Sequence, residues 1–167
     1  MKKLTIFKAY MSDQEDARKF YVNQLGFKLA EDKQLGDYRW LLVQAPDNRE
    51  VSLNLEVART AEEIALIGRQ AAAQPLFSLC TDDGSRDLEE LKRRDVGFDG
   101  KTKAMFYGTG VMMRDLYGNR IYLNQEPSET GIQPALRFAS CGEIGSVAFW
   151  PIPSTPFARN KSSAPRR

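Results

Sequence analysis

The chain carries the stretch VMMRDLYGNRIYLNQ at residues 111–125, which predicts two short strands joined by a tight turn. Gly118 and Asn119 tolerate positive φ angles and therefore suit a close connection between two strands. After the turn, apolar and polar residues alternate, and this two-residue period places Tyr122 and Asn124 on the same face. The stretch thus predicts a β-hairpin whose polar face looks at water or at a cavity.

The same order of elements is predicted twice along the chain. Each half shows the pattern of a strand, a helix and three further strands, and the first helix is expected at residues 14–24 after a capping Asp13. An offset of 71 residues places Gly26-Phe27 on Gly97-Phe98, and an offset of 70 aligns the last strands of the two halves. A unit this small cannot cover its own sheet, so the repeat predicts two four-stranded sheets that face a shared cleft, with helices outside.

The predicted fold class is therefore α+β. Paired βαβββ modules are expected at residues 1–57 and 75–127, forming a partly open, eight-stranded β-barrel that contains the cleft. Residues 58–74 are rich in Ala and Glu and are expected to be a partly helical linker. In residues 128–167, Ser, Pro, Gly and Ala interrupt every apolar run, which predicts an extension that is partly disordered or docks on a second copy.

Composition narrows the range of partners. The 167 residues contain 24 Lys and Arg against 22 Asp and Glu, a balance that argues against nucleic acid as a partner. The chain has no histidine, and its two cysteines form neither a spaced framework nor a CxxC pair, which favours a reducing cytoplasm. No apolar stretch approaches the length that crosses a membrane. We expect a soluble, cytoplasmic protein that contacts neither nucleic acid nor membrane.

Several short motifs occur in a fixed order between residues 3 and 127. They are Asp13 with Ala17-Arg18-Lys19-Phe20-Tyr21, Leu25-Gly26-Phe27, Gly36-Asp37-Tyr38-Arg39-Trp40, Thr81-Asp82-Asp83, Glu90-Leu91-Lys92, Val96-Gly97-Phe98 and Arg114-Asp115-Leu116-Tyr117-Gly118-Asn119. With this ordered set the chain closely resembles the vicinal oxygen chelate superfamily, which comprises the glyoxalase, bleomycin-resistance and extradiol dioxygenase fold. Leu116 stands where the family usually has proline. The resemblance implies a homodimer.

The resemblance also implies four metal-ligand positions. Metal-dependent members place His, Glu or Gln on the first and last strands of each module, and the matching positions here are Ile6, Ser52, Leu76 and Tyr122. Metals of the kinds these enzymes use prefer imidazole or carboxylate donors. None of the four side chains here is such a donor, so we expect no metal and no other cofactor. The fold alone does not predict a glyoxalase or dioxygenase activity.

The alternation of the strands predicts which side chains line the cleft. A small-molecule site combines apolar surface with a few polar groups, and aromatic side chains add walls to it. The predicted ligand-binding residues are Lys8, Tyr10, Trp40, Ser52, Asn54, Glu56, Phe106, Tyr107, Tyr122, Asn124 and Glu126, with Ser78 and Cys80 on the same face. The expected ligand is flat or partly cationic, and the resemblance to antibiotic-sequestering proteins implies that Glu56 and Glu126 attract its positive group.

Most of these residues also have a purely structural interpretation. Trp40 suits an apolar core, and Glu56 and Glu126 suit a solvated surface. Asn54 and Asn124 suit either caps at strand ends or a hydrogen bond to each other. Lys8 is either a buried counter-charge or a side chain that extends outward, and Cys80 is expected to be inert packing.

Two functions remain open from the sequence. The first is binding of a small organic molecule, such as a drug or an aromatic metabolite, in a metal-free cleft, a role that includes antibiotic resistance. The alternative is a glyoxalase-like lyase or dioxygenase-type enzyme with an atypical Mg or Mn site formed by Asn54, Glu56 and Glu126. No pair of nucleophile and general base is evident.

Overall fold

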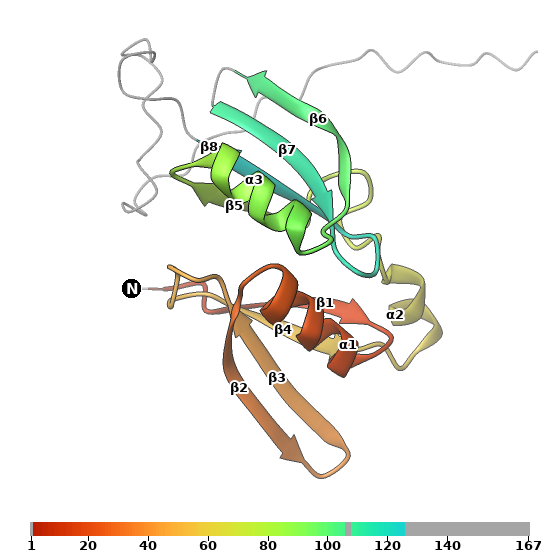
Figure 1. Ribbon diagram of the computed structural model, residues 1–167. Helices are drawn as coiled ribbons and strands as arrows, with labels where there is room; N and C mark the ends of the chain where they lie inside the picture. Colours follow the sequence, from red (N-terminus) through yellow and green to blue (C-terminus); the bar gives the residue numbers. More distant parts are fainter. Residues whose placement is uncertain (1, 106–107, 126–167) are drawn as a thin grey trace, which may run out of the picture. The chain divides into compact units, whose positions relative to one another are not determined.

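The computed structural model describes residues 2–105 and 108–125, which form two four-stranded sheets (Figure 1). The helices follow the first strand of each sheet along the chain, and one more helix connects the two sheets. The first half contains β1 (Ile6–Met11), α1 (Gln14–Lys19), the π-helical turn η1 (Phe20–Gln24), β2 (Lys28–Leu35), β3 (Tyr38–Gln44) and β4 (Ser52–Val57). After α2 (Ala61–Leu66), the second half contains β5 (Phe77–Thr81), α3 (Gly84–Arg93), β6 (Phe98–Met105), β7 (Gly108–Arg114) and β8 (Arg120–Gln125).

The two sheets have the same topology. The strand order is β1-β4-β3-β2 in the first and β5-β8-β7-β6 in the second, and in each the first strand pairs in parallel with the last. The remaining neighbours are antiparallel, including the predicted hairpin of β7 and β8. This confirms the α+β class and the repeated βαβββ unit. The sheets do not close into a complete barrel.

The first helix differs from the prediction of one helix over residues 14–24. Asp13 caps α1 as expected by accepting a hydrogen bond from the backbone N–H of Asp16, but α1 ends at Lys19. The backbone N–H of Leu25 then donates to the carbonyl oxygen of Phe20 at 3.0 Å, which is the wider spacing of a π-turn. This turn buries the rings of Phe20 and Tyr21, which lie with Ala17 and Leu25 on the apolar stripe that a helical period predicts.

An ion-pair network ties α1 to its sheet. Arg39 of β3 lies 3.2 Å from Glu15 and 2.7 Å from Asp32, and Arg18 contacts Glu15 from the same helix. The hydrogen bond from Arg18, with help from Arg39, lowers the pKa of Glu15 from 4.5 to about 2. Because the folded-state pKa is the lower one, this stabilisation is complete above pH 4.5 and is lost as the pH falls toward 2.

A carbon NMR titration tests this network. We expect the Glu15 carboxyl group of the wild-type protein to titrate with a pKa of about 2, and the pKa to rise toward 4.5 in an Arg18→Gln variant, which lacks the main hydrogen bond. A wild-type pKa near 4.5 would contradict the network.

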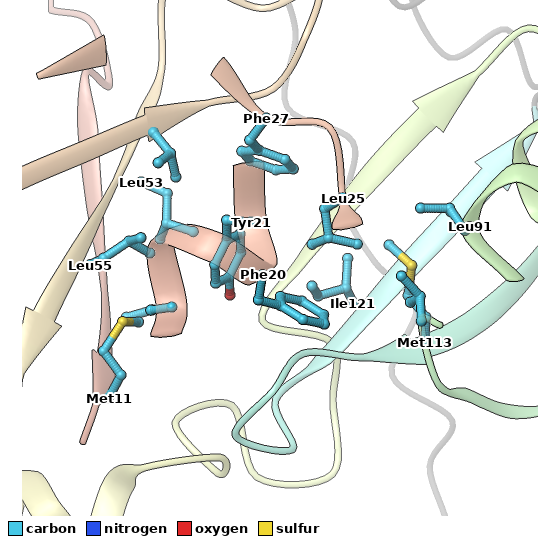
Figure 2. Packing of buried hydrophobic residues seen from close by; sticks show 14 of the residues in the cluster. Met11, Phe20, Tyr21, Leu25, Phe27, Leu53, Leu55, Leu91, Met113 and Ile121 are labelled. Carbon is cyan, nitrogen blue, oxygen red and sulfur yellow. The ribbon is translucent and has the colours of Figure 1, made fainter. Parts of the chain in front are cut away.

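The apolar core lies on the helix-covered faces of the sheets. Figure 2 shows buried side chains of the first half, including Tyr21 and Leu55, and of the second half, including Met113 and Ile121. These side chains form one hydrophobic cluster. The ring of Phe77 on β5 lies 5.5 Å from that of Phe7 on β1, so aromatic contacts connect the halves.

A buried carboxylate organises the turn between β7 and β8. Asp115 is 5% exposed, and its Oδ1 accepts the backbone N–H groups of Tyr117 and Asn119 at 2.9 and 2.8 Å. Its Oδ2 accepts the side-chain amide of Asn119 at 2.8 Å and the hydroxyl of Tyr21 at 2.9 Å. Burial, followed by the nearby Asp115 charge, raises the pKa of the Tyr21 hydroxyl well above its usual value. Gly118, with φ of +92°, closes the turn.

The segment after α2 contacts both halves. The side chain of Gln70 accepts the backbone N–H of Tyr10 and donates to the carbonyl oxygen of Lys8, so it occupies hydrogen-bonding groups on the edge strand β1. Gly68 approaches the backbone of Tyr117 closely. Within the described part of the chain, no helix has both the length and the apolar character needed to span a membrane.

Candidate functional site

Each sheet has a face opposite its core, and we call these the open faces. On β4, Leu53 and Leu55 point into the core, so alternation places Ser52, Asn54 and Glu56 on the open face of the first sheet. The register of β1 and β4 pairs Lys8 with Asn54 and Tyr10 with Glu56 on that face. Tyr38, Trp40, Leu42 and Gln44 of β3 complete it.

Glu56 is the charged centre of this face. Contrary to the interpretation as a solvated surface residue, it is only 7% exposed. Its Oε2 atom accepts the hydroxyl of Tyr38 at 2.6 Å and the amide of Asn54 at 3.3 Å, and it lies 3.4 Å from the ammonium of Lys8. Lys8 is therefore a counter-charge to Glu56. Burial, with the hydrogen bond to Glu56 as the next cause, raises the pKa of the Tyr38 hydroxyl.

Asn54 presents an unused acceptor. The residue is 1% exposed, and its side-chain oxygen Oδ1 is buried without a hydrogen-bond partner. The amide orientation is fixed chemically, because exchanging the oxygen and nitrogen would set two acceptors, Asn54 and Glu56, against each other. A buried acceptor without a partner is uncommon in folded proteins, and either an ordered water or a ligand donor that moves the covering side chains aside would satisfy it.

Two aromatic rings flank these polar groups. The rings of Tyr38 and Trp40 lie 6.2 Å apart at 47° to each other. Trp40 is on the open face and not in the core, and its indole N–H donates to Glu31 at 2.9 Å. The ammonium of Lys8 lies 5.7 Å from the centre of the Tyr10 ring.

A shallow hollow of about 450 Å³ adjoins this cluster on the same sheet. It is lined by Lys28, Leu29, Ala30, Glu31, Leu42, Gln44, Arg49 and Ser52. Leu42 and Ser52 are the neighbours of Asn54 across and along the sheet, so the hollow begins beside the unused acceptor. Its volume matches an organic molecule of drug size, while its lining is mostly polar and its shape is open.

The open face of the second sheet carries Tyr122 and Asn124 on β8. The Oδ1 atom of Asn124 is also buried without a hydrogen-bond partner, so the interpretation that Asn54 and Asn124 bond to each other is wrong. Ser78 and Cys80 are exposed on β5 beside Tyr122 and Asn124 in register. Phe106, Tyr107 and Glu126, which the sequence also placed at the site, lie outside the described residues, as does the predicted extension at 128–167.

The structure brings four predicted residues into one cluster, namely Lys8, Tyr10, Asn54 and Glu56. Tyr38 belongs to the same cluster, although the sequence analysis did not select it. The sequence could have predicted this position, because Tyr38 is two residues from Trp40 and a strand places such residues on one face. Glu31, the partner of Trp40, lies across a β-bulge in β2 whose position the pattern does not reveal.

Comparison with known proteins agrees with this architecture. Residues 3–123 match the glyoxalase/bleomycin resistance protein/dioxygenase superfamily. The chain belongs to this superfamily. An uncharacterized protein of Shewanella frigidimarina is 37% identical over 111 residues, which are 65% of this chain and 82% of that protein.

Two solved structures are also similar to this chain. TnmS3, described as an antibiotic-binding protein from Streptomyces sp. CB03234, has 32% identity and a TM-score of 0.64, and the match covers 76% of this chain and 98% of TnmS3. UcmS2 has 26% identity and a TM-score of 0.67, over 74% of this chain and 98% of UcmS2. One of the two similar proteins, TnmS3, is thus described as antibiotic-binding.

The side chains at the superfamily's metal positions do not fit a metal ion. Ile6 and Ser52 are in register on the open face, but Ile6 has no donor atom and the hydroxyl of Ser52 accepts a hydrogen bond from Gln44 at 3.0 Å. Leu76 also lacks a donor, and a neutral tyrosine such as Tyr122 is a poor ligand. Within residues 2–105 and 108–125, no three His, Cys, Asp or Glu side chains are grouped to hold a metal.

Proposed function

We propose that the open face of the first sheet binds a planar organic molecule of drug or aromatic-metabolite type, without a metal ion. The observation that supports this most strongly is the buried, unpartnered Oδ1 atom of Asn54 beside the rings of Tyr38 and Trp40. Because this atom is buried, a ligand would donate a hydroxyl or N–H group to it after the side chains that cover it move aside. Its planar body would gain contact with the aromatic side chains.

The charges of the cluster refine the expected ligand. The sequence suggested that Glu56 attracts a cation, but the ammonium of Lys8 already lies 3.4 Å from its carboxylate. The pair is neutral overall, so attraction of a cation by Glu56 is largely cancelled. A neutral molecule with hydrogen-bond donors therefore suits this face better than a strongly cationic one. The antibiotic-binding relative TnmS3 supports drug binding, and hence sequestration, as the biological outcome.

The enzymatic alternative is less well supported. A metal site built from Asn54 and Glu56 would need the Glu56 oxygens, and Lys8 places a positive charge at that carboxylate. Repulsion from this ammonium opposes a divalent ion at the same place. Elemental analysis of protein purified without chelators distinguishes the two functions, because one divalent ion per chain would contradict metal-free binding.

Calorimetric titration with matched probes tests the proposal. The probes are dihydroxyflavone, its dimethyl ether, which lacks the donors, and bleomycin as a cationic glycopeptide. We expect dihydroxyflavone to bind best, with an affinity that does not change in EDTA. An Asn54→Leu variant should bind it about 10- to 100-fold more weakly, because the buried acceptor is lost.

The control for this experiment is Asn23→Leu, which replaces an exposed asparagine of η1 and should leave the affinity unchanged. Absence of saturable heat with all three probes, or equal binding by the wild-type and Asn54→Leu proteins, would contradict the proposal.

A further inference from the structure

A second hollow lies on the open face of the second sheet. Its volume is about 160 Å³, and it is lined by Asp99, Lys101, Lys103, Gly110, Val111, Met112 and Tyr122. It belongs to strands β6, β7 and β8 and shares no residue with the cluster around Asn54. A cavity of about 150 Å³ accommodates one benzene ring, so this hollow has room for a single aromatic ring.

The charge around the hollow is positive. Its one acidic residue, Asp99, is 2.7 Å from Arg114 and 3.4 Å from Arg120, and the hydrogen bond from Arg114 lowers the pKa of Asp99. Lys101 and Lys103 are exposed and form no ion pair within the part of the chain that the structure describes. Two ammonium groups on one strand, with the neighbouring carboxylate already paired, favour an anionic group.

The floor of the hollow is apolar and is shaped by a glycine. A Cβ atom at Gly110 would lie 2.4 Å from the Cζ and Oη atoms of Tyr122, so the phenol end of Tyr122 packs on bare backbone. Register places Met112 directly beside Tyr122 on the open face. A ring entering the hollow would therefore meet a thioether and an aromatic side chain, both of which pack well against aromatic rings.

We propose that this hollow binds an aromatic carboxylate of one ring. The ring would contact Met112 and Tyr122, and the carboxylate would pair with Lys101 and Lys103. This site is separate from the one proposed above and differs from it in charge preference. It gives the chain two recognition surfaces, one for a neutral donor-bearing molecule and one for an aromatic acid.

Titration of the full chain with benzoate, followed by NMR, tests this inference. We expect shifts at the Met112 methyl group and the Tyr122 ring, binding that weakens with added salt, and no such shifts with benzamidine, the cation of matching shape. A Lys101→Gln/Lys103→Gln variant should bind benzoate about tenfold more weakly or worse.

The matched control is Lys92→Gln/Arg93→Gln, which removes two positive charges from the exposed surface of α3 and should keep benzoate affinity. Equal binding of benzamidine, or no shift at Met112 up to about 20 mM benzoate, would overturn the inference. Since benzoate is detected at Met112 and flavone binding depends on Asn54, failure of either proposal is recognised independently of the other.

Discussion

Replacing Asp115 by alanine is expected to lower the free energy of unfolding by about 3–5 kcal/mol. The substitution removes the acceptor of four hydrogen bonds in a site where Asp115 is 5% exposed. The hydroxyl of Tyr21 and the donors of Asn119 would then be left in the interior without their partner. Urea denaturation followed by circular dichroism measures the change.

Two further variants show whether the loss comes from the buried network. Tyr21→Phe removes one of the four donors and should cost about 1–3 kcal/mol, and its effect should largely vanish in the Asp115→Ala background. Asp32→Ala, which removes an exposed carboxylate paired with Arg39, should cost no more than about 1 kcal/mol. Similar losses for Asp115→Ala and Asp32→Ala would contradict the role of Asp115.

Replacing Gly68 by alanine is expected to destabilise the protein by about 2–4 kcal/mol. Gly68 has φ of +74°, and a Cβ atom there would lie 2.0 Å from the carbonyl oxygen of Tyr117. That oxygen belongs to the backbone of the turn organised by Asp115, so it cannot rotate away like a flexible side chain. The segment after α2 must therefore move away from the turn. Thermal unfolding measures the loss.

Gly36 provides the matched control for this prediction. It also has a positive φ, +61°, but no atom lies within 4 Å of the position that a Cβ would occupy. Gly36→Ala should therefore show only the backbone strain, about 1–2 kcal/mol. Equal destabilisation of the two variants would contradict the predicted clash between the new methyl group at position 68 and the Tyr117 carbonyl oxygen.

Much of the fold was predictable because the sequence pattern of the βαβββ unit occurs twice in the chain. The Gly-Phe pairs at 26–27 and 97–98 mark the end of each helical segment, and the alternation after Gly118 assigns the faces of β8. Strand alternation also placed Lys8, Asn54 and Glu56 on one face, since the apolar residues that alternate with them in β1 and β4 take the core-facing positions.

The remaining features depend on contacts between distant residues. The π-turn at Phe20–Gln24 is one of them, because the apolar residues of this segment fit a regular α-helix equally well. The sequence around Asp115 predicts an ordinary turn residue. Its role as the buried centre of a hydrogen-bond network also depends on Tyr21, which contacts it from the other half of the chain. The pairing of Lys8 with Glu56, which changes the expected charge of the ligand, likewise requires knowing that β1 and β4 are neighbours.

The most direct test of the proposed site is the side-chain carbonyl signal of Asn54, followed by carbon NMR during titration with dihydroxyflavone. The proposed function predicts a saturable change in the chemical shift of this carbon, in the direction expected when an unpartnered carbonyl accepts a hydrogen bond. The dimethyl ether should cause no such change. An Asn54 signal that stays unchanged while the flavone binds elsewhere would contradict the assignment of this face as the ligand site.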